Sequence, residues 1–304
     1  MTRFMVGTIQ TINENEEPSR RHLNFEFVSE LSPEEYNKVT EALTTLNKFL
    51  EDSQLFMIVT WNFNEFMELI AYYLHSLLIK DVDTFIQKPI NININRVFLN
   101  LLSSIRSYLD FMERLLKKRF GEGSVIFNNF KQTCAKEYDN NISYRFLYNL
   151  RHYAQHKGFP INSISMGQER SPDHSRGRNY YLHISIPRDE ILKDFDWRGL
   201  EDEIKSLPEK IDVIQNSAAF MESLNRIHIQ VINDLFRTLA DSAQQVLLIS
   251  KRLVGKDGEP MIFVFEGDVK NLRDLHHISL PVKLARHIVD GQLSDIFQHY
   301  ENNQ

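Results

Sequence analysis

The chain has 304 residues, with 35 Lys and Arg against 41 Asp and Glu, so the formal net charge is −6. Hydrophobic residues make up 42% and charged residues 25%, a balance that excludes collagen-like, disordered and disulfide-stapled chains. Only 11 Gly and 9 Pro are present, and because these residues interrupt helices we expect long helices and a mainly α fold. The single cysteine, Cys134, excludes an intrachain disulfide and favours a reducing cytoplasm.

The N-terminal residues and the most apolar stretch both argue against a membrane protein. Residues 1–10 contain no basic region followed by an apolar run, so no signal peptide is expected. Residues 54–79 are the most apolar, but Asn62, Glu65 and Glu68 interrupt them, which predicts a core helix and no membrane span. We therefore expect a cytoplasmic protein with no membrane partner.

The first 80 residues predict a hairpin followed by helices. Residues 4–12 and 22–28 alternate apolar and polar side chains around an acidic turn, a pattern typical of two paired strands. Ser32 and Glu35 form a capping box at the start of a helix. We expect that helix to run to about residue 51, and a second helix to follow from about residue 53 to 80.

Residues 89–157 predict a connector and three helices. Pro89 and the alternating Asn and Ile residues of 91–95 are interpreted as the connector, after which an amphipathic helix should run to Arg119. A shorter helix is expected over 125–138. The last helix, over 142–157, begins at the capping residues 139–141 and ends abruptly at Gly158 and Pro160.

The remaining chain predicts a mixture of strands and helices, and three regions in all. Strands are expected over 161–166, 179–186 and 261–265, and helices over 211–253 and 281–300. The expected organisation is an N-terminal hairpin over 1–30, a helical bundle over 31–160, and a C-terminal α+β region over 161–304 packed on the bundle, with one continuous domain as the alternative. The fold class is thus a mainly α bundle with small β-hairpin appendages.

Three side chains near the end of the 142–157 helix carry the functional argument: Arg151, His152 and His156. The pKa of imidazole lies close to physiological pH, so a histidine can accept and return protons there. Arginine is a permanent cation whose planar fork suits phosphate oxygens. Together these groups suffice to cleave RNA without a metal or cofactor, because the nucleophile, the ribose 2′-hydroxyl, belongs to the substrate.

Helical geometry limits how these side chains can cooperate. His152 and His156 are four residues apart and share a face. Arg151 and His156 are five residues apart, and therefore about 140° apart around the axis. The arginine must reach around the helix, or the last turn must be distorted, or a second chain must supply part of the site.

Arg151, the polar His152 and then His156 after three more residues resemble the Arg–polar–x–x–x–His signature of the HEPN superfamily, helical-bundle proteins common in bacterial toxins, abortive-infection systems and RNA-processing effectors. The resemblance extends from about residue 31 to 160 and implies a HEPN-like bundle with metal-independent endoribonuclease activity, in toxin–antitoxin systems or phage defence. It also implies a homodimer whose signature helices share one cleft, which would reunite Arg151 with His156.

The resemblance further implies a role for each residue and a set of partners. His156 would act as general base on the 2′-hydroxyl or as acid to the leaving oxygen, Arg151 would stabilise the charged transition state, and His152 would assist in orientation. The expected products are a 2′,3′-cyclic phosphate and a 5′-hydroxyl. The expected partners are RNA, a second copy of the chain, and a cognate antitoxin or regulatory protein.

Other interpretations of the same residues remain open. A cationic helix end is favoured by the helix dipole whatever its function. The histidine pair could bind Zn²⁺, which makes a zinc-binding protein a weaker alternative. A non-catalytic HEPN-like module that binds RNA or nucleotides, or acts as an adaptor, is the main alternative to an enzyme.

A basic segment downstream could contribute to RNA binding. Arg170, Arg176 and Arg178 lie in or beside the polar loop 167–178, and Lys157 ends the signature helix. Because the loop follows this helix closely in sequence, it could approach the same cleft and hold phosphates. The alternative is a solvated hairpin tip. On α-helical spacing, Arg106 and Asp110 are expected to form a surface ion pair.

Overall fold

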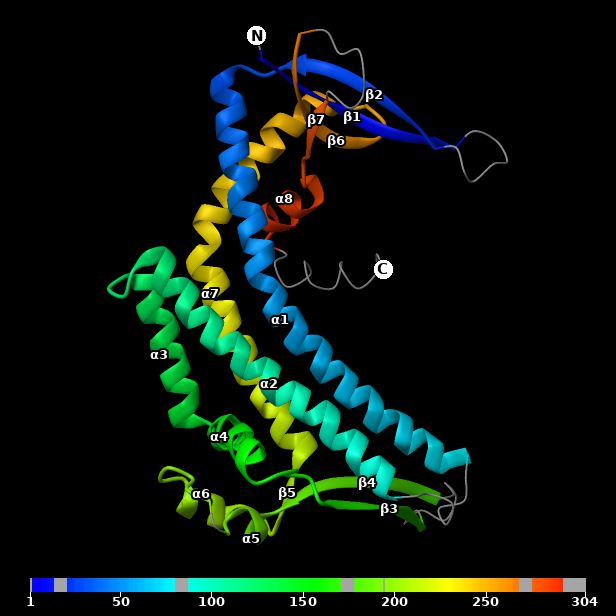
Figure 1. Cartoon of the computed structure of the whole chain (residues 1–304), viewed down its shortest axis with the longest axis vertical. Helices are drawn as coiled ribbons and strands as arrows, with labels where there is room; N and C mark the ends of the chain where they lie inside the picture. The colour runs from blue at the N-terminus through cyan, green and yellow to red at the C-terminus, as the bar shows by residue number, and fades with distance from the viewer. Residues whose placement is uncertain are drawn as a thin grey trace. The chain divides into compact units, whose positions relative to one another are not determined.

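Long helices dominate the computed structural model, which describes residues 2–13, 21–79, 87–170, 178–193, 195–267 and 275–291 (Figure 1). The mainly α class with small antiparallel sheets is confirmed. By their internal contacts the residues form two units. Unit 1 comprises Met1–Asp52 and Asn233–Gln304, and unit 2 comprises Ser53–Ile232. This division differs from the boundaries expected at residues 30 and 160. Within the described residues, no helix combines the length and apolar character needed to cross a membrane.

Unit 1 is built around a four-stranded antiparallel sheet in the order β2-β1-β6-β7. Its strands are β1 (Thr2–Asn13), β2 (Arg21–Glu30), β6 (Glu259–Glu266) and β7 (His276–Ser279), and its last helix is α8 (Val282–Val289). The expected N-terminal hairpin is confirmed, but it is not a separate appendage, because β1 also pairs with β6. Phe263 is fully buried on β6 and meets the edge of Phe27 from β2, with ring centroids 5.1 Å apart. The helix expected to reach residue 300 is described only to Val289; residues 292–304 lie outside the described ones.

Two helices differ from the sequence prediction, and both are longer than expected. The pieces expected over 33–51 and 53–80 form one helix, α1 (Pro33–Ile79), because no Gly or Pro follows Pro33 before its end. The connector expected over 91–95 belongs to α2 (Gln87–Phe120). Pro89 is tolerated because it stands in the first turn, where a backbone N–H has no helical partner. Ile90 and Ile94, four residues apart, are both buried against the bundle.

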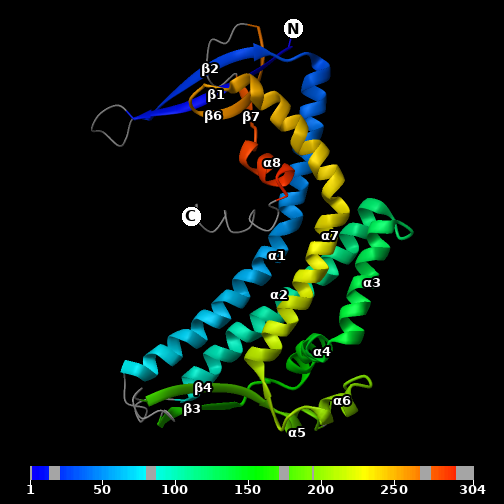
Figure 2. The ribbon, with the colours of Figure 1, turned by 180° about the vertical axis from the view of Figure 1, so that it is seen from behind.

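Unit 2 packs helices around aromatic side chains and carries a small sheet at one end. Its helices are the later part of α1, then α2, α3 (Val125–Asn140), α4 (Ile142–His156), α5 (Arg188–Ile191), α6 (Glu201–Ser206) and the first part of α7 (Val213–Ser250). The strands are β3 (Ser163–Arg170), β4 (Arg178–Pro187) and β5 (Lys210–Asp212), in the order β3-β4-β5. Helix α2 packs against both α3 and α4. In both overall views β3 and β4 lead away from α4 (Figure 2).

Candidate functional site

Helix α4 carries the predicted site, and its two ends are fixed by local chemistry. At the N-cap, the side chain of Asn141 accepts hydrogen bonds from the backbone N–H groups of Ser143 and Tyr144, at 2.9 and 3.3 Å. At the other end Lys157 closes the last turn, and Gly158 follows with φ +124°, a backbone conformation that favours glycine. The helix therefore stops one turn after Arg151, as the sequence predicts.

The chain beyond α4 is held by a buried asparagine of α2. Asn95 is fully buried, and its amide donates to the carbonyl of Ile161 at 2.7 Å while its side-chain oxygen accepts from the N–H of Ile161 at 3.2 Å. This reciprocal pair satisfies both backbone groups of a buried residue. It fixes where the chain leaves the signature helix, so the last turn of α4 has a defined position in unit 2.

The three signature side chains lie together at this end of α4 and differ in exposure. The rings of His152 and His156 are in edge-to-face contact, with centroids 4.4 Å apart. His156 is exposed, whereas His152 and Arg151 are half-buried. The Nε atom of Arg151 is buried and has no hydrogen-bond partner among the described residues. Lys157 is exposed beside them.

A segment that sequence reasoning did not connect with the site packs against α4. Trp197 is fully buried; its ring stacks on Phe146 and on Tyr153 of α4, with centroids 5.8 and 5.7 Å away. Its indole N–H donates to the carbonyl of Ile191 at 2.8 Å. Tyr153 thus packs in this aromatic cluster. The anchored tryptophan brings the next residue, Arg198, close to the signature.

The electrostatic environment keeps His152 neutral. Partial burial lowers the pKa of His152 below its usual 6.5, and the positive charges of His156, Arg198 and Arg151 lower it further, in that order, while Asp196 opposes them. At pH 7 this imidazole is therefore predominantly a proton acceptor.

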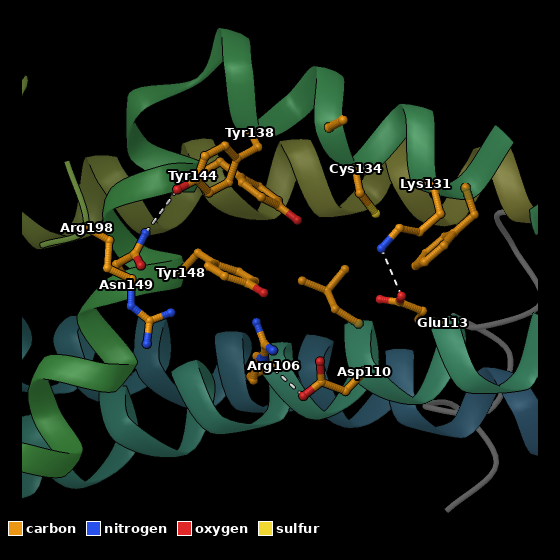
Figure 3. A pocket seen from close by; sticks show the side chains of 13 residues that line it. Arg106, Asp110, Glu113, Lys131, Cys134, Tyr138, Tyr144, Tyr148, Asn149 and Arg198 are labelled. Carbon is orange, nitrogen blue, oxygen red and sulfur yellow. Dashed lines mark hydrogen bonds and ion pairs between the residues drawn. The ribbon is translucent and has the colours of Figure 1, made fainter. Parts of the chain in front are cut away.

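A pocket of about 390 Å³ opens beside the signature, between α2, α3, α4 and the turn that contains Arg198 (Figure 3). The rings of Tyr138 and Tyr148 stand perpendicular to each other in it, with centroids 6.1 Å apart. The guanidinium of Arg106 lies over the ring of Tyr148 at 4.6 Å, a cation–π contact. The pocket is also lined by Asp110, Glu113, Lys131, Cys134, Tyr144 and Asn149.

The charges of this pocket are only partly balanced. Arg106 pairs with Asp110 at 2.9 Å, as its helical spacing predicts, although the pair lines a pocket. Lys131 pairs with Glu113, also at 2.9 Å. Arg198 makes no ion pair with any described residue, so the pocket carries one uncompensated positive charge. Burial raises the pKa of the Cys134 thiol to about 12, so the thiol is neutral and is not a nucleophile.

The downstream arginines are not brought to the signature by the described part of the hairpin. Arg170 and Arg178 face each other at the far end of the β3–β4 ladder, and Arg176 lies outside the described residues. Seven residue steps separate Arg170 from Ser163, so β3 carries it about 23 Å along the strand. Of the predicted RNA-binding residues that the structure describes, only Lys157 lies beside Arg151 and His156 in the sequence of the signature helix.

The zinc alternative has two contacting imidazoles and nothing further in its favour. In the part of the chain that the structure describes, no group of three or more His, Cys, Asp or Glu side chains could hold a metal ion. Structural zinc sites use four protein ligands and catalytic sites three. The described geometry thus places two contacting imidazoles, one of them exposed, at the end of α4.

No family model, curated protein or solved structure matches this chain. The site is therefore argued from its own geometry. Sequence reasoning missed Arg198 and Tyr148. A signal for Arg198 exists in Asp196-Trp-Arg-Gly199, a turn in which the side chain of Asp196 accepts the N–H of Arg198 at 2.8 Å. A signal for Tyr148 is its place one helical turn before His152.

Proposed function

We propose that the protein is a metal-independent endoribonuclease of the HEPN type that acts as a homodimer. The observation that carries this proposal is the group at the end of α4: two contacting imidazoles, one of them exposed, beside an arginine whose Nε has no partner among the described residues. The exposure of His156 matters, because an imidazole buried in the core of the bundle could not reach a polynucleotide.

The reaction uses groups that the substrate and these side chains already provide. One imidazole removes the proton of the ribose 2′-hydroxyl, and the oxygen attacks the adjacent phosphorus. The bond from phosphorus to the 5′-oxygen breaks, and that oxygen receives a proton from the acid. The products are a 2′,3′-cyclic phosphate and a 5′-hydroxyl. Arg151 stabilises the charge that develops on the phosphate oxygens, His156 is the base or the acid, and His152 orients it.

A second copy of the chain completes the site. Arg151 and His156 lie about 140° apart around α4, so their side chains leave the helix in different directions. Two copies related by a twofold axis with their α4 ends facing would set Arg151 of one copy against His156 of the other. The proposed setting is the cytoplasm, in a toxin–antitoxin or phage-defence system with a cognate antitoxin or regulatory protein.

The test is cleavage of a structured RNA by purified protein in the presence of EDTA. Wild type should cleave it and leave 2′,3′-cyclic phosphate ends, and Arg151→Ala should lower the rate by about 10²–10³-fold, the loss seen when one charge-stabilising donor is removed. Arg237→Ala, which removes an exposed arginine of α7, is the matched control. Cleavage that survives Arg151→Ala at the wild-type rate would falsify the assignment.

A non-catalytic module that binds RNA or nucleotides is the second candidate. The tyrosine-lined pocket favours it, because aromatic rings and a cation, Arg198, that has no ion-pair partner among the described residues are sufficient for binding. This candidate predicts RNA binding by wild type without any cleavage product, in the same EDTA-containing reactions.

A further inference from the structure

We propose that the pocket between α2, α3 and α4 binds one nucleobase of a single-stranded RNA, and that Arg198 holds the phosphate leading from this base to the imidazole pair. The inference rests on the proposed ribonuclease function, because it assigns the substrate's next nucleotide to a place beside the same site. The pocket would be the part of the site that chooses the base.

The lining suits a flat aromatic ligand. Tyr138, Tyr148 and the guanidinium of Arg106 present planar groups to the interior, as Figure 3 shows. RNA-binding proteins stack unpaired bases on tyrosine rings and on arginine planes. The volume of about 390 Å³ is within the range of small-ligand pockets, which extends from about 300 to 1,000 Å³. It accommodates a single unstacked nucleoside and excludes a base that remains stacked in a duplex.

Asn149 gives the pocket a hydrogen-bond acceptor with a fixed orientation. Its side-chain N–H group donates to the carbonyl of Arg145 at 2.8 Å and to the hydroxyl of Tyr138 at 3.5 Å. Because a carbonyl can only accept, the amide nitrogen must face it, and the side-chain oxygen of Asn149 is left without a donor among the described residues. An acceptor at this place can receive an N–H from the Watson–Crick edge of an unpaired base, either an exocyclic amino group or the ring N–H of guanine or uracil.

Arg198 is suited to the phosphate for two reasons. Its guanidinium has no carboxylate partner among the described residues, whereas the other cations of the pocket, Arg106 and Lys131, are paired. Its backbone also has φ +55°, a strained conformation for a residue with a Cβ, and such strain is concentrated at functional sites. An ordinary turn would use glycine here, so the arginine side chain is retained in spite of an unfavourable backbone.

The spacing along α4 links the pocket to the chemistry. Tyr148 and His152 lie on the same face, one turn or about 6 Å apart along the axis. Arg198 both lines the pocket and acts electrostatically on His152, so it stands near both. A base held against Tyr148 would therefore have its adjoining phosphate at Arg198 and at the imidazoles, which is the arrangement a nuclease needs.

The experiment measures binding separately from cleavage. The probe is a fluorescent 2′-fluoro oligonucleotide, which lacks the nucleophilic hydroxyl, and versions of it with one abasic position each; affinity is read by anisotropy with the full chain. Tyr148→Ala and Arg198→Ala should each weaken binding about tenfold. Tyr148→Phe keeps the ring and should stay within about twofold of wild type. Arg237→Ala is the charge-matched control for Arg198→Ala.

A double-mutant cycle decides whether a base occupies the pocket. At one oligonucleotide position, removal of the base should itself weaken binding about tenfold and should abolish the further effect of Tyr148→Ala. The inference is overturned if the affinity losses from base removal and from Tyr148→Ala add at every oligonucleotide position. It is also overturned if no oligonucleotide binds. Arg198→Ala, at an exposed turn, keeps the test valid should Tyr148→Ala fail to fold.

The two proposals fail in different ways. In one outcome wild type cleaves natural RNA, but Tyr148→Ala and Arg198→Ala bind the oligonucleotide as tightly as wild type does. That outcome would overturn the base pocket and still support the ribonuclease. Coupled binding at one position without any cleavage would overturn the nuclease and support the pocket, as part of a binding module.

Discussion

His228 and the pair His152 and His156, all in unit 2, differ in burial and in the groups that surround their rings. His228 on α7 is buried, stacks on Phe56 with ring centroids 3.7 Å apart, and shares a 2.8 Å hydrogen bond with the hydroxyl of Tyr108. Burial lowers its pKa to about 3, so this imidazole stays neutral and serves packing. His152 and His156 lie at the end of α4, where His156 is exposed and where the charges of Arg198 and Arg151 help to lower the pKa of His152. The contrast teaches that the surroundings of an imidazole decide whether it only packs in the core or remains accessible to solvent and ligands.

The largest expected effect comes from removing the exposed imidazole. His156→Ala should lower kcat/KM for RNA by about 10²–10⁴-fold, because a positioned general acid or base contributes that much. The free energy of unfolding should change by less than about 0.5 kcal/mol, since the side chain is exposed. Cleavage rates in EDTA and urea denaturation measure the two quantities. His75→Ala, another exposed imidazole, is the control, and an equal loss of activity in that variant would contradict the comparison.

The buried imidazole should instead make stability depend on pH. The unfolded chain protonates His228 near pH 6.5, whereas the folded chain does so only at about pH 3, so between these values the unfolded state binds more protons. Stability therefore falls as the pH decreases below 6.5, by about 1.36 kcal/mol per unit and about 3 kcal/mol between pH 7 and pH 4. Urea denaturation of wild type and His228→Gln checks this contribution. If the free energy of unfolding falls equally with decreasing pH in wild type and in His228→Gln, His228 is not the source of the pH dependence.

Substitutions at Arg198 should affect the stability of its strained turn and the binding of RNA separately. Arg198→Gly and Arg198→Ala both remove the guanidinium, but only glycine relieves the backbone at φ +55°. The glycine variant should therefore be more stable than the alanine variant by about 1 kcal/mol. Both should bind RNA more weakly than wild type. Thermal unfolding and anisotropy give the two readings, and equal stabilities would mean that the turn is not strained.

The smallest effect concerns the pH profile of cleavage. The acidic limb of kcat/KM should lie below pH 6.5, because a neutral His152 is needed to orient His156, and burial and the neighbouring positive charges lower the pKa of His152 below 6.5. Arg198→Ala removes one of the charges that lower this pKa, so the limb should move to higher pH. Steady-state rates across the pH range measure it. If the acidic limb does not move in Arg198→Ala, Arg198 does not influence the pKa of His152.

Local chemistry was readable from the sequence, and long-range packing was not. The end of α4 was predicted within one residue because Asn141, Gly158 and Pro160 act on their own neighbours. The prediction of a connector over 91–95 was wrong, because the alternation of Asn and Ile there hides a helical pattern. Ile94 and the neighbouring Ile90 are four residues apart and are buried on one face of α2.

In the candidate site, too, local spacing places some residues and long-range packing places the others. Arg151, His152 and His156 stand on a single helix, so spacing alone places them at its end and brings the two imidazoles together on one face. Arg198 reaches them through the packing of Trp197 against Phe146, a contact between segments about 50 residues apart in sequence. No periodicity in either segment encodes that contact, and no local pattern announces that Tyr148 faces Arg106.

The pairing of β1 with β6 has a consequence for the order of assembly. Thr2 lies opposite Glu266, and the two side chains are 264 positions apart along the chain. During synthesis β1 emerges before β6 and cannot pair with it until residues 259–266 have been made. Unit 2 is a single uninterrupted stretch between the two strands and can fold in the meantime. The helix with the imidazoles can therefore be complete on the ribosome while β1 still lacks its β6 neighbour.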